Sequence, residues 1–235
     1  GGERTASRFD LKRKVRQIMK IGVIGAGGRL GGKISTEALD RGMDVTAIIH
    51  RTPCRDGRAS VMKKDLFDLK REDISGFGAL ISAFGSGFTA DPAINKQAIA
   101  HLAEIAVGTG IHLIMIGGAG CLYADGSETV CVYEMPDHPA FLKGISWNLV
   151  QGYEQLKHTD DVDWTFVCPS KLLDPDGPRT GDYLTRTDRH IPINEDGNSY
   201  VSYDDLAIAM VDFGQNGSFK RQLVAVASRR GGPQA

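Results

Sequence analysis

Near its N-terminus the chain has a short apolar run that ends in glycines and passes directly into a helix-forming segment. Residues 21–24 (IGVI) predict a buried strand, and Gly25, Gly28 and Gly31 follow with G-x-x-G-x-x-G spacing. Glycine allows a backbone to turn sharply and lie close to a ligand. The start of the following helix offers unpaired N–H groups and a positive dipole end to a pyrophosphate. This pattern predicts the first βα turn of a dinucleotide-binding fold, with a purely structural tight turn as the alternative.

The rest of the sequence alternates between strand-like and helix-compatible segments. This alternation predicts an α/β fold, a Rossmann-like doubly wound parallel sheet with helices on both faces, over one domain of residues 19–235. Residues 171–200 are rich in Gly, Pro, Asp and Arg, and we expect a loop-and-hairpin excursion there, on the substrate side of the nucleotide. The expected strands are 20–24, 44–50, 60–62, 79–83, 111–116, 164–168 and 222–227, and the expected helices are 29–41, 91–107, 139–157 and 203–213. Gly42 is expected just after the end of the first helix, and Ser202 with Asp205 resembles a capping box that opens the last one.

Composition limits the class of protein. The chain has 235 residues, 41% hydrophobic and 24% charged, and no apolar run approaches the roughly 20 residues that span a bilayer. Its four cysteines lack C-x-x-C spacing, and its six histidines lack metal-ligand spacing. We therefore expect no metal site, no membrane association and a reduced, cytoplasmic protein.

The first twenty residues are unusually basic. They hold seven Lys or Arg residues against two acidic residues, although the whole chain has a net charge of −1. A basic arm can bind nucleic acid, but Phe9 is the only aromatic residue among these charges. We expect residues 1–18 to be a leader or a disordered extension, and we expect no nucleic-acid partner.

Ligands of open α/β sheets bind beyond the carboxyl ends of the strands, so the residues after each strand are candidate contacts. Between Val45 and Cys54, around the end of the second strand, no acidic residue is available to bind a ribose 2′-hydroxyl. Arg51 offers a guanidinium suited to a 2′-phosphate, or is simply solvated. This favours NADP, with NAD as the alternative. Asp65 and Leu66 could contact adenine; the alternative for the acidic pair Asp65 and Asp68 is a structural role, with Asp68 as a helix or turn cap. The expected cofactor contacts are Gly25, Gly27, Gly28, Arg29, Leu30, Gly31, Arg51, Asp65, Leu66, Ala83, Phe84, Gly85 and Gly117.

The fifth expected strand is followed by Gly117-Gly118-Ala119-Gly120-Cys121-Leu122-Tyr123. These glycines would place flexible backbone beside a nicotinamide. Cys121 and Tyr123 are then the nearest candidates for proton donation or substrate hydrogen bonding. For Cys121 the alternative is a small buried filler, because no neighbouring His or helix start lowers its pKa.

Several of these segments together resemble a known family. The chain is similar to the atypical short-chain dehydrogenases/reductases with an NmrA-like NAD(P)H-binding domain, in particular the group labelled putative NADH-flavin reductases. The resemblance implies a Rossmann domain, a nicotinamide cofactor and a small C-terminal substrate-side region. The matching segments are 20–31, 38–51, 64–69, 117–123, 163–169, 178–183 and 201–209.

The sequence departs from this family at two positions. The family usually has Thr or Ser where this chain has Gly27, and Ser where it has Cys121, so two hydroxyl contacts are lost. Tyr153 and Lys157 fit the Y-x-x-x-K pair of catalytic short-chain dehydrogenases, in which the lysine helps the tyrosine to transfer a proton. Tyr153 lies only 11 positions before Trp164, too near the end of its helix, and we expect it to be structural.

These expectations lead to a functional hypothesis. We expect an NADPH-preferring oxidoreductase that transfers hydride to a small planar acceptor, such as FMN, FAD or a quinone, without a tyrosine acid. Arg179 and Tyr183 are the expected substrate contacts, with loop packing as the alternative. A non-catalytic NADP(H) sensor is the second hypothesis; sugar-nucleotide epimerisation is disfavoured by the short chain and the absent acid. We expect a monomer or a homodimer.

Overall fold

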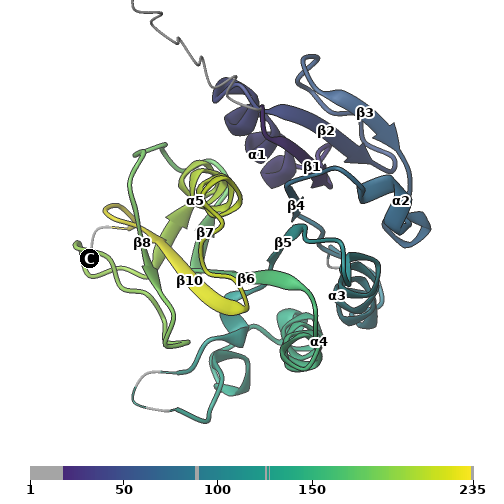
Figure 1. The fold of residues 1–235 in the computed structure, drawn as a ribbon. Coiled ribbons are helices and arrows are strands. Elements are labelled where there is room, and N and C mark those ends of the chain that lie inside the picture. The colour runs from purple at the N-terminus through teal and green to yellow at the C-terminus, as the bar shows by residue number, and fades with distance from the viewer. Residues whose placement is uncertain (1–17, 88–89, 125, 127, 234–235) are drawn as a thin grey trace, which may run out of the picture.

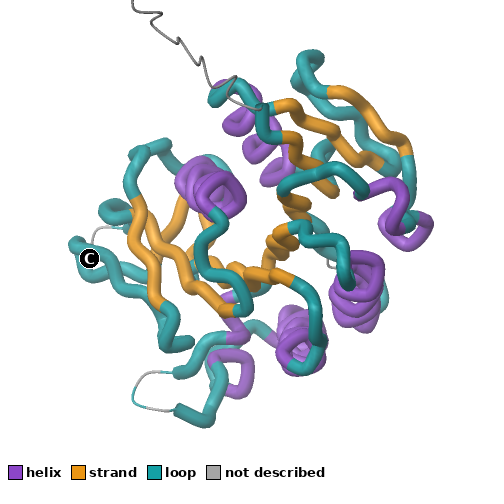
Figure 2. The backbone as a smooth tube through the Cα atoms, viewed as in Figure 1, coloured by secondary structure: helices purple, strands orange, loops and turns teal. Residues whose placement is uncertain are grey.

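The computed structural model describes residues 18–87, 90–124, 126 and 128–233. The expected leader, residues 1–18, falls outside this part of the chain except for its last residue. In the described part, eight strands form one main sheet (Figures 1 and 2). In spatial order they are β3 (Ser60–Lys63), β2 (Asp44–Ile49), β1 (Lys20–Ile24), β4 (Ala79–Ser82), β5 (His112–Ile116), β6 (Asp163–Pro169), β10 (Gln222–Ser228) and β8 (Tyr183–Arg186).

Helices cover both faces of this sheet. Helices α1 and α5 pack together on one face, and α3 and α4 pack together on the other (Figure 1). The predicted α/β Rossmann-like class is therefore confirmed. The helices are α1 (Arg29–Asp40), α2 (Arg71–Ile74), α3 (Ala93–Ala106), α4 (Ala140–Lys157) and α5 (Tyr203–Asn216), with 3₁₀ turns η1 (Leu66–Asp68), η2 (Ala119–Cys121) and η3 (Val132–Glu134).

The strand order reverses direction between β1 and β4. From β1 the chain proceeds outward through β2 to β3, and then returns to place β4 on the other side of β1, with both neighbours parallel to it. A crevice at the carboxyl ends of the strands forms at such a switch point. The core strands are apolar on both faces because helices cover both, as expected of a parallel sheet: Val23 and Leu80 are fully buried.

The excursion after β6 differs from the prediction. The expected hairpin does not form: β7 (Leu172–Asp174) pairs in parallel with β9 (Tyr200–Ser202), and β8 joins the main sheet antiparallel to β10. Strands β7, β8 and β9 are only three or four residues long, and β7 and β8 are partly exposed. They therefore lack the long apolar runs by which the central strands can be recognised in the sequence. The short helix α2 was missed for the same reason of length.

Two predicted helix ends were tested by the structure. Gly42 follows α1 with φ of +76°, the left-handed conformation expected after a helix end. Ser202 caps α5 by accepting a hydrogen bond from the Asp205 N–H at 3.1 Å. The reciprocal half of the expected capping box is wrong, because the Asp205 carboxylate instead accepts from the backbone N–H groups of Thr180 and Gly181.

A buried histidine couples the stability of the fold to pH. His112, at the start of β5, is 3% exposed, and its Nε2 lies 2.7 Å from Thr165 Oγ1. Burial lowers the pKa of His112 to about 4, and the nearby charge of Lys220 acts in the same direction. His112 therefore binds a proton near pH 6.5 in the unfolded chain, but only near pH 4 in the folded chain. The free energy of unfolding decreases as the pH falls through this window, because protonation favours the unfolded chain.

Replacing His112 by glutamine should remove this dependence. We expect the loss in free energy of unfolding between pH 7 and pH 4.5 to be about 2 kcal/mol smaller in His112→Gln than in the wild type. Urea denaturation at the two pH values measures it. His158→Gln, at an exposed histidine, is the control and should match the wild type. Equal acid losses in His112→Gln and the wild type would contradict the assignment.

Candidate dinucleotide site

The turn between β1 and α1 has the geometry that the glycine pattern predicted. Gly25 adopts φ of +76°, and its carbonyl accepts a hydrogen bond from the Gly28 N–H at 2.8 Å. A Cβ built on Gly31 would lie 2.1 Å from the Gly25 carbonyl oxygen, a distance that no side chain tolerates. Glycine at position 31 therefore lets the first turn of α1 pack directly against the β1 turn, the close helix–strand approach of nucleotide-binding folds.

The start of α1 is open to an anion. Gly28 is the N-cap and provides no side-chain cap, and the first turn has no acidic residue. The first helical hydrogen bond runs from Gly32 N–H to the Gly28 carbonyl, so the amides of Arg29, Leu30 and Gly31 precede it and need an acceptor from outside the helix. A pyrophosphate fits this cradle of bare amides and positive dipole.

The neighbouring strand ends complete the crevice. Ala83, directly after β4, donates its N–H to the Ile24 carbonyl, and its own carbonyl lies 3.2 Å from a Cβ built on Gly25. On the other side, a Cβ on Gly27 would lie 1.9 Å from the Thr52 carbonyl oxygen. The loop after β2 thus rests on the glycine turn, and the hydroxyl side chain usual at position 27 in the related family would not fit this arrangement.

Arg51 and Asp65 follow β2 and β3 at the same edge. The Arg51 side chain is exposed. Asp65 caps η1 by accepting from the Phe67 N–H at 2.9 Å, and its other carboxylate oxygen lies 3.1 Å from His50 Nδ1. Leu66 is buried. The roles of Arg51, Asp65 and Leu66 toward a cofactor stay predictions. The capping residue is Asp65, whereas the sequence had suggested Asp68, which lies within η1.

A charged cleft of about 740 Å³ adjoins the start of α1. It is bounded by the flank of α1, the loop after β2 and the segment after β7, and includes Gly28, Arg55 and Asp176. Arg29 reaches across it to Asp176 at 2.5 Å, with both side chains largely exposed. Such an exposed pair contributes little to stability, and its arginine is available to exchange the carboxylate for a phosphate.

The expected nicotinamide end lies after β5. A Cβ on Gly117 would lie 2.4 Å from the Phe166 ring, so packing alone requires glycine there. A Cβ on Gly85, by contrast, would meet nothing within 4 Å. Cys121 is fully buried, which fits the alternative of a small core residue and argues against a role in proton donation. Tyr123 is half-buried, and its hydroxyl accepts a long hydrogen bond of 3.4 Å from Arg189.

Arg189 organises this region and was not among the predicted residues. Its Nε donates to the Cys121 carbonyl at 2.8 Å, and one of its terminal nitrogens lies 3.2 Å from Glu154. Its guanidinium also lies over the rings of Tyr123 and Tyr153, at 4.7 and 5.0 Å from their centres. A lone arginine in a loop gives no sequence signal for contacts with three distant segments.

The surroundings of Tyr153 and Lys157 indicate a structural role for this Y-x-x-x-K pair. Tyr153 is 9% exposed and packs against the rings of Trp164 and Phe166. Burial raises the pKa of Tyr153 to about 12, the opposite of what a proton-transferring tyrosine needs. Lys157 pairs with Glu154 at 2.5 Å. The pair therefore lacks the acidity and the access of a catalytic couple.

The structure separates Arg179 and Tyr183 from Cys121 and Tyr123. Arg179 pairs with Glu37 of α1 at 2.7 Å, and the Tyr183 hydroxyl donates to Asp212 of α5 at 2.8 Å. Tyr183 packs against the core on the α1–α5 face, whereas Cys121 belongs to the core on the α3–α4 face. The packing alternative thus explains both contacts of Arg179 and Tyr183, and their substrate role stays a prediction.

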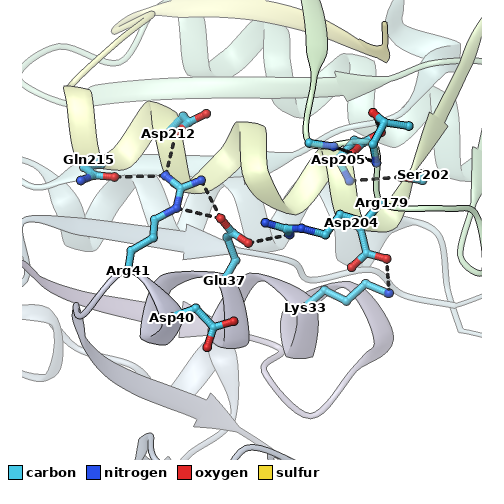
Figure 3. A network of polar contacts seen from close by, with 12 residues as sticks. Lys33, Glu37, Asp40, Arg41, Arg179, Ser202, Asp204, Asp205, Asp212 and Gln215 are labelled. Atoms are coloured by element: carbon cyan, nitrogen blue, oxygen red, sulfur yellow. Dashed lines mark hydrogen bonds and ion pairs between the residues drawn. The ribbon is translucent and has the colours of Figure 1, made fainter. Parts of the chain in front are cut away.

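Figure 3 shows the polar network that holds the excursion in place. Glu37 accepts from Arg179 and from Arg41, and Arg41 also reaches Asp212 and Gln215. Hydrogen bonds from these two arginines lower the pKa of Glu37 against the opposing effect of burial, so its carboxylate stays ionised. Asp205 is fully buried and accepts from Thr180 and from Ser228 Oγ at 2.6 Å. Glu37 was not among the predicted residues, and Asp205 was predicted only as part of a capping box.

Two features are absent from the part of the chain that the structure describes. No helix in this part of the chain is both long and apolar enough to cross a bilayer. No group of three or more His, Cys, Asp or Glu side chains there is arranged to hold a metal ion.

Comparison with known proteins defines the class of this dinucleotide site. Residues 25–216 match the family model described as NAD(P)H-binding, and the chain belongs to that family. The uncharacterized protein YwnB of Bacillus subtilis is 34% identical over 211 residues, which cover 89% of this chain and 99% of that protein.

Two solved structures show the same architecture. The chain is similar to SP1627 of Streptococcus pneumoniae, named a putative NADH-flavin reductase, with a TM-score of 0.84, 34% identity and coverage of 89% of this chain and 99% of that one. It is also similar to a protein of Bacteroides thetaiotaomicron named a putative epimerase, with a TM-score of 0.77, 26% identity and coverage of 92% and 100%. The fold is shared by proteins with different names, so the acceptor must be argued from this site.

The close approach at Gly31 can be tested by a matched pair of variants. Gly31→Ala should destabilise the protein by about 1–3 kcal/mol, because its methyl group forces α1 away from the β1 turn. Gly32→Ala, one position later, has 3.6 Å to the nearest atom and should be neutral or slightly stabilising. Denaturant unfolding measures both. A stability of Gly31→Ala equal to that of Gly32→Ala would show that the turn tolerates a side chain.

Proposed function

We propose that this chain is an NADPH-preferring reductase that delivers hydride to a small planar acceptor such as a flavin or a quinone. Membership of the NAD(P)H-binding family and the bare amides at the start of α1 support the cofactor. The name of the streptococcal relative supports a flavin as acceptor. The observation that carries the proposal is the glycine turn, with Gly31 packed against Gly25, at the switch point of the sheet.

The residues of the chain would bind and orient rather than transfer protons. The amides of Arg29, Leu30 and Gly31 would hold the pyrophosphate, and Arg51 would face the ribose 2′-phosphate. The nicotinamide end of the dinucleotide would lie along the turns after β4 and β5 and reach the edge of α4. When bound, the nicotinamide supplies the hydride, and alignment of the donor and acceptor rings is the main task left to the protein.

Buried Tyr153 and Cys121 favour an acceptor that needs no protein acid at this end. A flavin meets this condition, because hydride adds to a ring nitrogen and solvent protonates the reduced ring. The same burial also favours the second hypothesis, a protein that binds NADP(H) and signals to a partner without turnover. An assay of NADPH turnover distinguishes the reductase from the sensor.

The reductase should oxidise NADPH in the presence of FMN. Loss of absorbance at the nicotinamide band, followed at saturating NADPH and increasing FMN, should show saturable turnover. Gly28→Trp should abolish it, because the side chain would occupy the cleft at the start of α1. Gly28 adopts φ of −78°, which any residue can adopt, and a Cβ there would lie 3.2 Å from the Gly25 carbonyl oxygen, a contact that a small shift relieves.

Gly57→Trp is the matched control for this assay. A Cβ at exposed Gly57 meets nothing within 4 Å, so this variant should keep wild-type turnover. Tight NADPH binding without oxidation across several flavins and quinones would refute the reductase and support the sensor. Absence of NADPH binding would refute both.

Coenzyme preference tests Arg51. Arg51→Ala should raise the Kd for NADPH by about tenfold or more, as expected for loss of a charged hydrogen bond, and change that for NADH less than about twofold. Calorimetric titration of the wild type and the variant with both coenzymes measures these Kd values. Arg71→Ala, a change of the same charge on α2, is the control and should alter neither value. Equal weakening of both coenzymes in Arg51→Ala would rule out the 2′-phosphate role.

A further inference from the structure

An exposed ion pair crosses the charged cleft beside the start of α1. Arg29 Nη2 lies 2.5 Å from Asp176 Oδ1, and the two side chains are 54% and 86% exposed. Arg29 is the first residue of α1, and Asp176 lies 147 positions further along the chain, in the segment after β7. Both residues line the cleft. The pair therefore places a carboxylate from a distant segment where a phosphate of the cofactor is expected to bind.

Two further ion pairs border the same cleft, and both are more enclosed. Lys33 pairs with Asp204 at 2.6 Å, with 32% and 24% of these side chains exposed (Figure 3). Arg179 pairs at 2.7 Å with Glu37, whose side chain is only 8% exposed. An ion pair in water contributes little to stability, so the pair of Arg29 is the least costly of the three to break. Arg29 is therefore the cation that can turn most readily to a ligand.

The Asp176 carboxylate is held at the cleft by the turn on which it lies. Asp174 Oδ1 accepts a hydrogen bond from the Asp176 N–H at 3.0 Å, and the Tyr200 hydroxyl donates to Asp174 Oδ2 at 3.2 Å. A Cβ built on Gly177 would lie 2.1 Å from the same hydroxyl, so this turn packs against Tyr200 without room for a side chain. The backbone of Asp176 thus has a fixed place, whereas the side chain of Arg29 is free to turn.

The Asp176 carboxylate occupies positive charge that a phosphate would use. The first turn of α1 contains no acidic residue, although a helix start favours a nearby anion. Asp176 supplies that anion from outside the helix. The lining of the cleft holds four basic and five acidic side chains, so the cleft as a whole offers an anion no excess of positive charge. A cofactor phosphate that contacts Arg29 must therefore compete with this carboxylate.

We propose that Asp176 is an internal competitor for the phosphates of the cofactor. Its carboxylate holds Arg29 in the free protein, and a phosphate displaces it when NAD(P)H binds, so Asp176 lowers the affinity for the coenzyme. The displacing group is the pyrophosphate or the ribose 2′-phosphate, which share the same chemistry. This inference rests on the cofactor position given in the proposed function, and not on its acceptor or its turnover.

A double-variant cycle read by calorimetric titration with NADP⁺ tests the competition. Asp176→Asn keeps the shape of the side chain and removes its charge. It should lower the Kd for NADP⁺ by about fivefold, because the phosphate no longer has to break an ion pair. In an Arg29→Gln background the same change should alter the Kd by less than about twofold, because no guanidinium is left to compete for. This non-additivity separates competition for Arg29 from general repulsion between Asp176 and the phosphate.

Titration with NAD⁺ identifies the phosphate. Because NAD⁺ lacks the 2′-phosphate, a lower Kd for both coenzymes in Asp176→Asn assigns the exchange to the pyrophosphate. A lower Kd for NADP⁺ alone assigns it to the 2′-phosphate. Either result supports the competitor. The gain in affinity should also shrink as added salt screens the exposed pair.

Asp163→Asn is the matched control. Asp163 forms a similarly exposed pair with Lys220 at 2.5 Å, and it begins β6, at the edge of the sheet opposite the cofactor crevice. Loss of this charge should leave the Kd values for NADP⁺ and NAD⁺ unchanged. A fall in Kd equal to that of Asp176→Asn would show an effect of net charge alone, and would overturn the proposal.

Three other results would overturn the competitor. One is an NADP⁺ Kd that is unchanged or higher in Asp176→Asn; a higher value would mean that the carboxylate binds the coenzyme. Another is an equal fall in Kd with and without Arg29. The third is absence of binding of NADP⁺ and NAD⁺, which also overturns the cofactor position. The expected Kd values without NADPH oxidation by flavins or quinones would support the competitor and refute the reductase.

Discussion

The contact between Gly31 and the Gly25 carbonyl is the constraint on which the site depends. A helix can point its first amides at a ligand over the sheet edge only if its axis passes close to the end of the strand that precedes it. Here a single methyl group would come within 2.1 Å of a backbone oxygen, so glycine alone permits this approach. The position of α1 then fixes the crevice beside β4 and the surface on which the loop after β2 rests at Gly27.

A second constraint comes from two buried carboxylates. Glu37 and Asp205 lie on different helices of the same layer, and a buried carboxyl group requires hydrogen-bond partners that replace its water. Arg179 supplies one to Glu37, and the backbone of Thr180 and Gly181 supplies others to Asp205. These contacts therefore attach the segment after β7 to the α1–α5 layer. Its arginine, Arg179, is held by the fold through its pair with Glu37.

The sequence was informative where interactions are local. Apart from the short helix α2, the strands and α-helices through β6, and the glycine turn, follow from apolar runs, glycine spacing and helix ends, and their boundaries agree with the structure within a few residues. The pairing of Arg179 with Glu37 joins residues 142 positions apart, and no periodicity marks such a contact. The Ser202–Asp205 pattern predicted a local capping box. The Asp205 carboxylate instead accepts hydrogen bonds from the backbone of residues 180–181, which are distant in the sequence. Short β8 lacked the pattern that would reveal its antiparallel place beside β10.

The burial pattern also bears on the kind of acceptor. Reduction of an isolated carbonyl places developing charge on oxygen, which requires a nearby acid of suitable pKa. Tyr153 is enclosed by aromatic rings and has its pKa raised to about 12, and Cys121 has no exposed surface. A conjugated ring delocalises the incoming electron pair and can take its proton from water, so it makes the smaller demand on this site. What such a ring requires of the protein is a fixed position and orientation beside the nicotinamide.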